Sequence, residues 1–206
     1  MNKFEWLFFD LDGTLVDNLK KLYFVYLNFL EKYHKDGNED EFETLNGPNI
    51  HEIINILAKK YQLKENIEKL EDEYERLILD EFSTLSPKKG VIESLHSLKK
   101  EGYKIALVTS NSKKNIESFL NKYNFYQIFD SMTFGDEVKN AKPAPDIYEL
   151  SVKKNRLDKN EILVLEDSEN GIKSAENAGL KCKKIEKNFQ FENFKEELRQ
   201  IEQKRI

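Results

Sequence analysis

Residues 7–14 of the chain read Leu-Phe-Phe-Asp-Leu-Asp-Gly-Thr, an apolar run that leads directly into two carboxylates. The apolar residues predict a buried strand, and Asp10 then lies at the carboxyl end of that strand. Gly13 permits a turn that lets Asp12 point into the same site. A turn closed by aspartate side-chain hydrogen bonds is the simpler interpretation of the same residues, so their meaning depends on the rest of the chain.

Short apolar runs rich in strand-forming residues recur outside this stretch. With the first run included, they lie at Glu5–Asp10, Lys104–Thr109, Ser131–Phe134, Glu161–Glu166 and Lys181–Ile185. Segments with helical periodicity separate most of them. This alternation predicts an α/β fold built on a doubly wound parallel sheet.

Residues 16–86 differ from both ends of the chain because they show no convincing strand pattern. Three segments instead carry apolar residues at helical spacing. The three apolar faces are Leu19, Leu22, Tyr23, Tyr26, Leu27 and Leu30; Ile50, Ile53, Ile54, Leu57 and Tyr61; and Ile67, Leu70, Tyr74, Leu77 and Ile78. We predict a small all-helical cap domain over 16–86, inserted after the first strand of a core domain formed by 1–15 and 87–206. The cap is expected over the carboxyl end of that strand, where open α/β sheets bind ligands.

Composition restricts the class of protein. The 206 residues carry a net charge of −5, with acidic and basic residues interspersed, which argues against nucleic acid as a partner. No apolar stretch approaches the roughly 20 residues that cross a bilayer, and the first ten residues do not resemble a secretory signal, so we expect a cytoplasmic protein with no membrane partner. Cys182 is the single cysteine, which leaves no internal disulfide and no zinc-site spacing.

Charge is divided unevenly along the chain. Residues 16–86 hold 16 acidic and 9 basic side chains, a net of −7, so the remainder has about +2. An anionic substrate is therefore expected to be held by the core.

Polar groups also follow the later predicted strands. Thr109, Ser110 and Asn111 can cap a helix or donate hydrogen bonds to phosphoryl oxygens. Lys142 is followed by Pro143 and Pro145, which restrict its approach, although a single lysine is usually solvated. Glu166 and Asp167 end an apolar run, and adjacent carboxylates at a strand end repel one another unless a cation is present. Magnesium, which prefers oxygen ligands, would relieve that repulsion.

Taken in order, these four pieces resemble the motifs of the haloacid dehalogenase-like superfamily, specifically the members with a helical cap inserted after the first motif. Asp10 and Asp12 match motif one, Thr109 motif two, Lys142 motif three, and the pair at 166–167 motif four. The resemblance spans nearly the whole chain. It implies a Rossmann-like core and a Mg²⁺ cofactor.

The resemblance also implies a ligand set and a mechanism. Magnesium would be held by Asp10, the backbone carbonyl of Asp12, and Asp167, with Glu166 at or near the metal. Asp10 is the expected nucleophile, which forms a phospho-aspartyl intermediate, and Asp12 the expected acid and then base. Lys142, Thr109 and Ser110 would stabilise the phosphoryl charge. The predicted activity is hydrolysis of a small phosphorylated metabolite, by an enzyme we expect to be a monomer whose cap opens and closes.

A β-phosphoglucomutase-like mutase is the alternative, since such proteins share these motifs and this cap. Their cap usually presents a basic residue to the second phosphate, and residues 44–51 contain no Arg or Lys, which favours hydrolysis. Asn46, Asn49 and His51 are candidate substrate contacts in this loop, together with Ser110 and Asn111 in the core. Helix capping is an equally good interpretation of the loop residues.

Two other classes remain open. A receiver domain of signalling proteins also uses an aspartate, a lysine and magnesium, but it predicts a shorter chain without a helical insertion. A non-catalytic member of the same superfamily is expected to lack one of the motif residues, and here none is missing.

Overall fold

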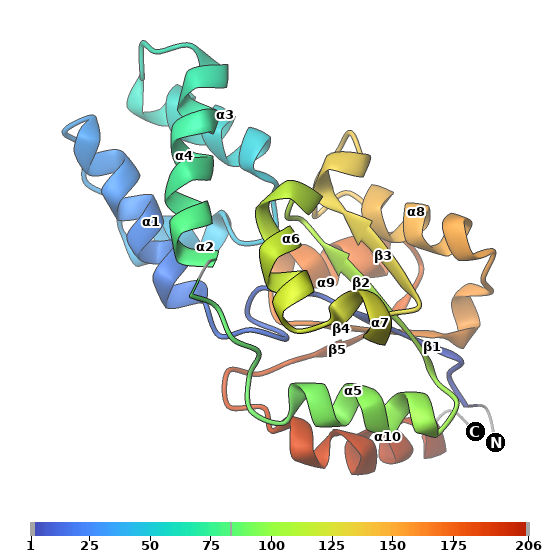
Figure 1. Cartoon of the computed structure of the whole chain (residues 1–206). Coiled ribbons are helices and arrows are strands. Elements are labelled where there is room, and N and C mark those ends of the chain that lie inside the picture. The colour runs from blue at the N-terminus through green and yellow to red at the C-terminus, as the bar shows by residue number, and fades with distance from the viewer. Residues whose placement is uncertain (1–2, 83, 205–206) are drawn as a thin grey trace.

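The computed structural model describes residues 3–82 and 84–204, and a five-stranded parallel sheet forms its centre (Figure 1). The strands are β1 (Trp6–Phe9), β2 (Lys104–Thr109), β3 (Ser131–Phe134), β4 (Ile162–Glu166) and β5 (Lys181–Lys184). Their order in the sheet is β3-β2-β1-β4-β5, and every neighbouring pair is parallel. The predicted sheet and its five strands are confirmed. Because β1 is central, the residues that follow it lie at the middle of the carboxyl edge.

Alternating side chains of the strands enter two separate cores, as expected for a sheet covered on both faces. In β1, Leu7 and Phe9 belong to one core and Phe8 to the other. Helices α5 (Val91–Lys100), α6 (Lys113–Lys122), α7 (Phe125–Ile128) and α10 (Phe194–Gln203) contribute to the first core. Helices α8 (Asp146–Asn155) and α9 (Glu169–Asn177) contribute to the second. Short 3₁₀ turns lie at Gly135–Glu137, Lys159–Glu161 and Phe191–Asn193.

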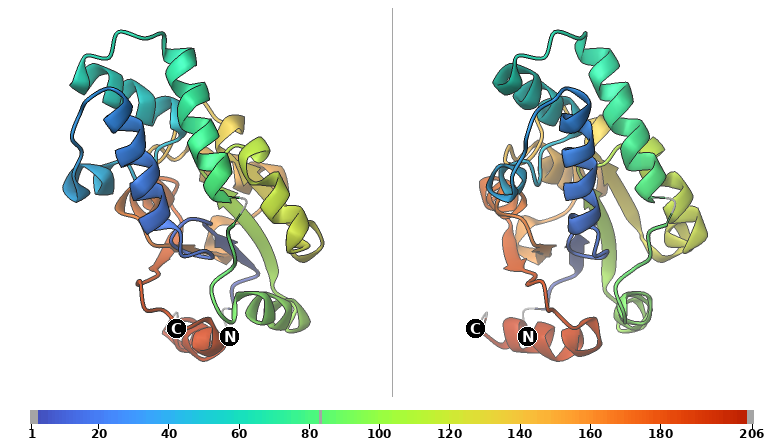
Figure 2. Two further views of the ribbon diagram at one scale, coloured as in Figure 1. Left: turned by 60° about the vertical axis from the view of Figure 1, so that its left-hand side comes forward. Right: turned by 90° about the vertical axis from the view of Figure 1, so that its left-hand side faces the viewer.

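Four helices occupy the insertion between β1 and α5, beyond the carboxyl edge of the sheet (Figures 1 and 2). They are α1 (Leu19–Lys32), α2 (Glu39–Thr44), α3 (Ile50–Tyr61) and α4 (Ile67–Phe82). An antiparallel bridge between Val16 and Pro87 brings the two connections to the core side by side. The division of the chain into a core domain and a cap domain at these connections stays a prediction.

The expectation of three helices in the insertion was wrong by one, because α2 escapes a periodicity test. Its six residues include a single large apolar side chain, Phe42. The helix is nucleated instead by Asn38, whose side-chain oxygen accepts a hydrogen bond from the Glu41 amide. An asparagine cap followed by acidic residues was the available signal.

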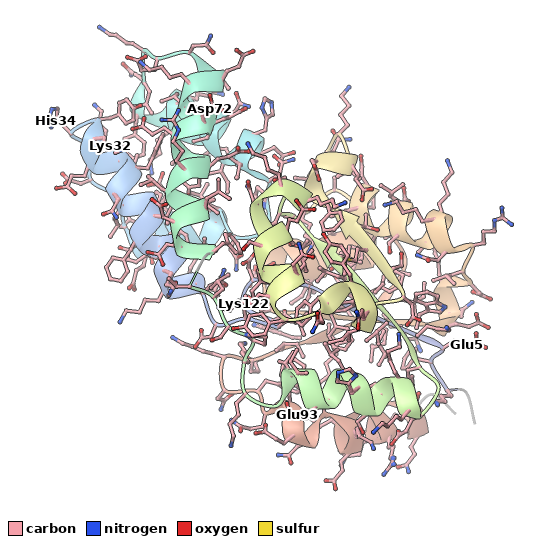
Figure 3. The ribbon with its side chains drawn as sticks, in the orientation of Figure 1. Glu5, Lys32, His34, Asp72, Glu93 and Lys122 are labelled. Atoms are coloured by element: carbon pink, nitrogen blue, oxygen red, sulfur yellow. The ribbon has the colours of Figure 1, made fainter. Side chains whose placement is uncertain are left out.

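The surface is dominated by charged side chains that project from the helices, among them Lys32, Asp72 and Glu93 (Figure 3). Within residues 3–82 and 84–204, no helix combines the length and the apolar character needed to span a membrane.

Candidate active site

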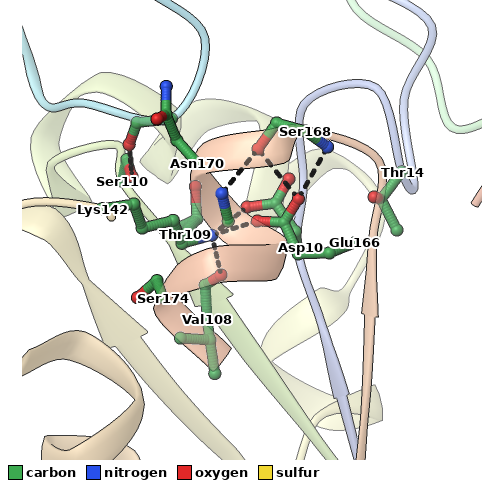
Figure 4. Close-up of polar contacts among 12 residues, drawn as sticks. Asp10, Thr14, Val108, Thr109, Ser110, Lys142, Glu166, Ser168, Asn170 and Ser174 are labelled. Atoms are coloured by element: carbon green, nitrogen blue, oxygen red, sulfur yellow. Dashed lines mark hydrogen bonds and ion pairs between the residues drawn. The ribbon is translucent and has the colours of Figure 1, made fainter. Parts of the chain in front are cut away.

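Lys142 is a buried cation between two carboxylates at the carboxyl edge of the sheet (Figure 4). Its Nζ lies 2.7 Å from Asp10 Oδ1 and 2.6 Å from Glu166 Oε1. Burial by itself lowers the pKa of Lys142, but the two carboxylates outweigh burial and raise that pKa well above its usual value. The ammonium group also lies 5.2 Å from the ring centroid of Tyr148. Lys142 therefore stays protonated inside the protein.

The sheet explains why these groups meet. Asp10 directly follows β1, Glu166 ends β4, and the Asp10 amide continues the pairing of the two strands by donating to the Leu165 carbonyl over 3.1 Å. Carboxyl ends of neighbouring parallel strands meet at one edge, so two distant sequence motifs become adjacent.

Asp10, Glu166 and Asp167 form an acidic cluster in which one oxygen from each lies within 4.8 Å of the others. Burial raises the pKa of Asp10 well above its ordinary value, and Glu166 and Asp167 add to this effect while Lys142 opposes it. Burial, followed by the nearby Glu166 charge, raises the pKa of Asp167 to about 7. Burial and mutual repulsion disfavour the ionised form of these carboxylates, and a divalent cation with oxygen ligands would relieve that repulsion.

The oxygens of this cluster differ in how far the protein already uses them. Glu166 Oε2 accepts hydrogen bonds from the Ser168 amide at 3.0 Å and the Ser168 hydroxyl at 3.1 Å, while Oε1 faces Lys142. Asp167 Oδ1 accepts from the Thr14 hydroxyl at 3.0 Å. Both Glu166 oxygens are thus engaged by the protein, whereas Asp10 and Asp167 each have one oxygen that accepts no hydrogen bond from the described residues.

Two glycines leave the space that these carboxylates occupy. Gly13 has φ +81°, and a Cβ on it would come within 2.1 Å of Asp167 Oδ2. A Cβ on Gly171 would come within 1.7 Å of Glu166 Oε1. The turn after Asp12 therefore requires glycine both for its backbone conformation and for the close approach of Asp167.

The Asp12 carboxylate is not part of the acidic cluster. Its two carboxylate oxygens accept hydrogen bonds from the side-chain amides of Asn18 and Asn111. Burial raises the pKa of Asp12, although the two amide donors oppose that rise. Sequence reasoning missed Asn18, which precedes α1; nothing in the local pattern shows that its side chain turns back toward Asp12.

The residues that follow β2 make different contacts. The Thr109 hydroxyl is buried and accepts from the backbone and side-chain N–H groups of Asn111, both at 3.2 Å. Ser110 donates its hydroxyl to the Gly47 carbonyl in the insertion. Ser110 and Asn111 line the cavity described below, whereas Thr109 supports Asn111 from behind.

The loop at 44–49 packs onto the core. The side-chain amide of Asn170, which sequence reasoning missed, donates to the carbonyls of Thr44 at 3.2 Å and Asn46 at 2.6 Å. Asn46 and Asn49 both line the cavity, and the Asn49 side chain also caps α3 by accepting from the Glu52 amide at 2.9 Å. His51 is exposed and pairs with Glu71 at 2.5 Å, so its suggested substrate contact finds no support in this arrangement.

A cavity of about 70 Å³ separates the insertion from the carboxyl edge of the sheet. Asp10, Asp12 and Glu166 line its core side together with Ser110 and Asn111. The helices of the insertion supply the opposite wall. The candidate nucleophile and the candidate acid therefore line the same cavity, and Lys142 lies behind Asp10 and Glu166.

Comparison with known sequences assigns the chain to a protein family. A family model described as haloacid dehalogenase-like hydrolase matches residues 7–185, from within β1 to just beyond β5. The chain belongs to the haloacid dehalogenase-like hydrolase family. The resemblance inferred from the four motifs is confirmed, and haloacid dehalogenase-like membership identifies the chain as an enzyme of a hydrolase family.

Relatives within the haloacid dehalogenase-like family carry phosphatase names. A phosphorylated carbohydrates phosphatase from Thermotoga maritima is 34% identical over 180 residues, which cover 85% of this chain and 82% of that protein. Pyrophosphatase PpaX from Bacillus cereus is 26% identical over 183 residues, which cover 87% and 82% of the two proteins. The solved structure of β-phosphoglucomutase from Clostridium difficile has a TM-score of 0.81 at 20% identity, covers 96% of this chain and 98% of that chain, and shows the same fold.

Proposed function

We propose that this chain is a Mg²⁺-dependent phosphomonoester hydrolase that acts through a phospho-aspartyl intermediate on Asp10. The buried contact between Lys142, Asp10 and Glu166, next to Asp167, is the observation that carries the proposal. The 34% identity to a phosphorylated carbohydrates phosphatase supports a small phosphorylated metabolite as substrate.

Asp10 and Asp12 each act in both half-reactions. An Asp10 oxygen bonds to phosphorus as the ester P–O bond breaks, and Asp12 gives its proton to the leaving oxygen. A water then attacks phosphorus, Asp12 takes the proton of that water, and the bond between Asp10 and phosphorus breaks. Burial, which raises the pKa of Asp12, favours the protonated form that the first step needs.

Lys142 contributes a fixed positive charge to both steps. It stabilises Asp10 as a carboxylate before attack and the phosphoryl charge during transfer. Glu166, with both oxygens hydrogen-bonded, holds the lysine in place. Ser110 and Asn111 offer hydrogen-bond donors on the same side of the cavity.

The residues present fit magnesium. Asp10 and Asp167 would hold the ion through the oxygens that the protein leaves without partners, and the Asp12 carbonyl is the third proposed ligand. Bound there, magnesium would supply charge neutralisation for the phosphoryl oxygens. Glu166 is better suited to hold Lys142 than to bind the ion directly, since its oxygens are already engaged.

The insertion acts as a movable cap in this proposal. Ser110, Asn170 and the Ala141 amide, which donates to Glu52 over 2.8 Å, hold the insertion against the core in the structure. A cavity of about 70 Å³ below the insertion admits a phosphorylated metabolite only if this wall opens.

Phosphate release is the test. Wild type and Asp10→Asn would be assayed on p-nitrophenyl phosphate and a panel of sugar phosphates, nucleotides and phosphoglycolate, with Mg²⁺ or EDTA. Release that needs Mg²⁺ and disappears in Asp10→Asn is the expected result. Conversion of β-glucose 1-phosphate to glucose 6-phosphate without phosphate release would establish a mutase instead, and silence in both assays would point to a binding protein.

A further inference from the structure

The charged side chains that line the active-site cavity are all carboxylates. Asp10, Asp12 and Glu166 lie on the core side, and no Lys, Arg or His from the described residues joins them in the lining. Lys142 is already paired with Asp10 and Glu166, and Lys88, whose Nζ donates to the Gly13 carbonyl, does not line the cavity. A substrate with a second anionic group would therefore find no counter-charge beyond the phosphoryl site.

The wall supplied by the insertion is mostly apolar, with Tyr74, Asn46 and Asn49 as its polar side chains. Its lining side chains include Leu22 from α1, Phe42 from α2, Ile50 and Ile53 from α3, and Ile78 from α4. All but Ile78 are only partly buried, so they present apolar surface to the cavity rather than filling the interior of the insertion. Burying a charged group against such a wall is unfavourable, because the water it loses is not replaced by hydrogen bonds.

Several of the polar groups that the loop at 44–49 brings to the cavity are already used by the protein. The Asn46 and Gly47 carbonyls accept from Asn170 and Ser110, and the Asn49 side-chain oxygen caps α3. With the insertion in this position, the loop still offers the cavity the side-chain amide of Asn46 and the side-chain NH₂ group of Asn49, neither of which carries a charge.

Size restricts the substrate as well. With the insertion in this position the cavity measures about 70 Å³, so a compact leaving group suits it better than a large one.

We infer that the enzyme prefers phosphomonoesters with a compact, uncharged and largely apolar leaving group over esters with a second anionic group. The inference rests on the proposed phosphatase function and names the substrate class of the same site.

A matched pair of esters tests it. Isobutyl phosphate and 2-phosphoglycolate place the same number of non-hydrogen atoms beyond the ester oxygen, but the first ends in two methyl groups and the second in a carboxylate. We expect kcat/KM of the wild type to favour isobutyl phosphate by about tenfold or more, since a single apolar group in a complementary pocket is worth roughly that factor.

A variant in the apolar wall makes the test specific. Ile53→Arg would place a cation in the lining, and it should reduce the preference for isobutyl phosphate by about tenfold or more or reverse it. Ile56→Arg is the matched control, because Ile56 lies on the same helix, is 44% exposed and does not line the cavity. It should leave the preference unchanged.

The phosphatase function and the substrate preference are distinguished by different outcomes. Hydrolysis of p-nitrophenyl phosphate together with equal or better use of 2-phosphoglycolate by the wild type would overturn the inference and leave the phosphatase function standing. An equal change in preference in both arginine variants would also overturn it, since the effect would not come from the cavity. If no ester released phosphate, the proposed function and the inference would both be wrong.

Discussion

Lys142 is a buried lysine, and its removal should destabilise the protein more than the removal of a surface lysine. It is 1% exposed and neutralises two buried carboxylates, Asp10 and Glu166. Lys142→Met would leave both negative charges without a partner, and loss of one member of a buried ion pair typically costs about 3–5 kcal/mol. We expect the variant to lose activity and to lower the free energy of unfolding by about that amount at pH 7, measured by urea denaturation.

The destabilisation should become smaller in acid, where Asp10, whose pKa is raised by burial, accepts a proton and becomes neutral. Lys153→Met, on the exposed face of α8, is the control and should change the free energy of unfolding by less than about 0.5 kcal/mol. A Lys142→Met protein as stable as the wild type at pH 7 would show that the two carboxyls do not depend on the ammonium group.

Helix α2, the element that periodicity failed to predict, is held in place by Glu41. This carboxylate is 9% exposed, accepts a hydrogen bond from Tyr61 at 2.5 Å and another from Tyr26, and lies 2.8 Å from Lys60. Burial alone would raise the pKa of Glu41, but these partners together lower it. Glu41 therefore connects α2 to both α1 and α3.

The direction of the pKa shift predicts a pH dependence. A carboxyl with a lowered pKa stabilises the fold above its unfolded pKa of about 4.3, and that stabilisation is lost as the pH falls through the folded value. Glu41→Gln should lower the free energy of unfolding by about 1–3 kcal/mol at pH 7, and the difference from wild type should shrink below about pH 4.

Thermal or urea denaturation across pH would measure this difference. Glu39→Gln changes an exposed residue of the same helix and should show almost none of it. A difference that stayed constant down to acid pH would mean that the charge of Glu41 contributes nothing.

At the scale of the whole molecule, ion binding should stabilise the fold. The acidic cluster joins residues from the ends of β1 and β4, so a cation bound there contacts only the folded chain. Binding to the native state alone adds about 2.7 kcal/mol when the ion is at a hundred times its dissociation constant. We expect the melting temperature to rise with MgCl₂ relative to EDTA.

Potassium chloride at equal ionic strength and the variant Asp167→Asn are the controls, and both should lose most of this rise. An equal rise with potassium chloride would reduce the effect to general screening of charge.

Local pattern alone determined a large part of this protein. Four of the five strands and three of the four insertion helices follow from the pattern of apolar residues, because that pattern records which faces the core will cover, whereas β5 reads Lys-Cys-Lys-Lys and carries little of this signal. The motif residues were also visible, since polar groups directly after buried strands must lie at one edge of a parallel sheet. Asp10 and Glu166 could be brought together on paper for this reason, whereas Lys142, eight residues beyond β3, was assigned to the site by the family resemblance.

Contacts between distant segments decided the rest. That Asn18 holds Asp12, that Asn170 holds the loop at 44–49, and that both Glu166 oxygens are engaged depends on where side chains point after the chain has folded. The apolar wall of the cavity arises in the same way, from four helices that each show a different part of one face. A periodic pattern indicates which apolar residues share one face of a helix. Only the packing of the folded chain decides whether that face contacts the core or the cavity.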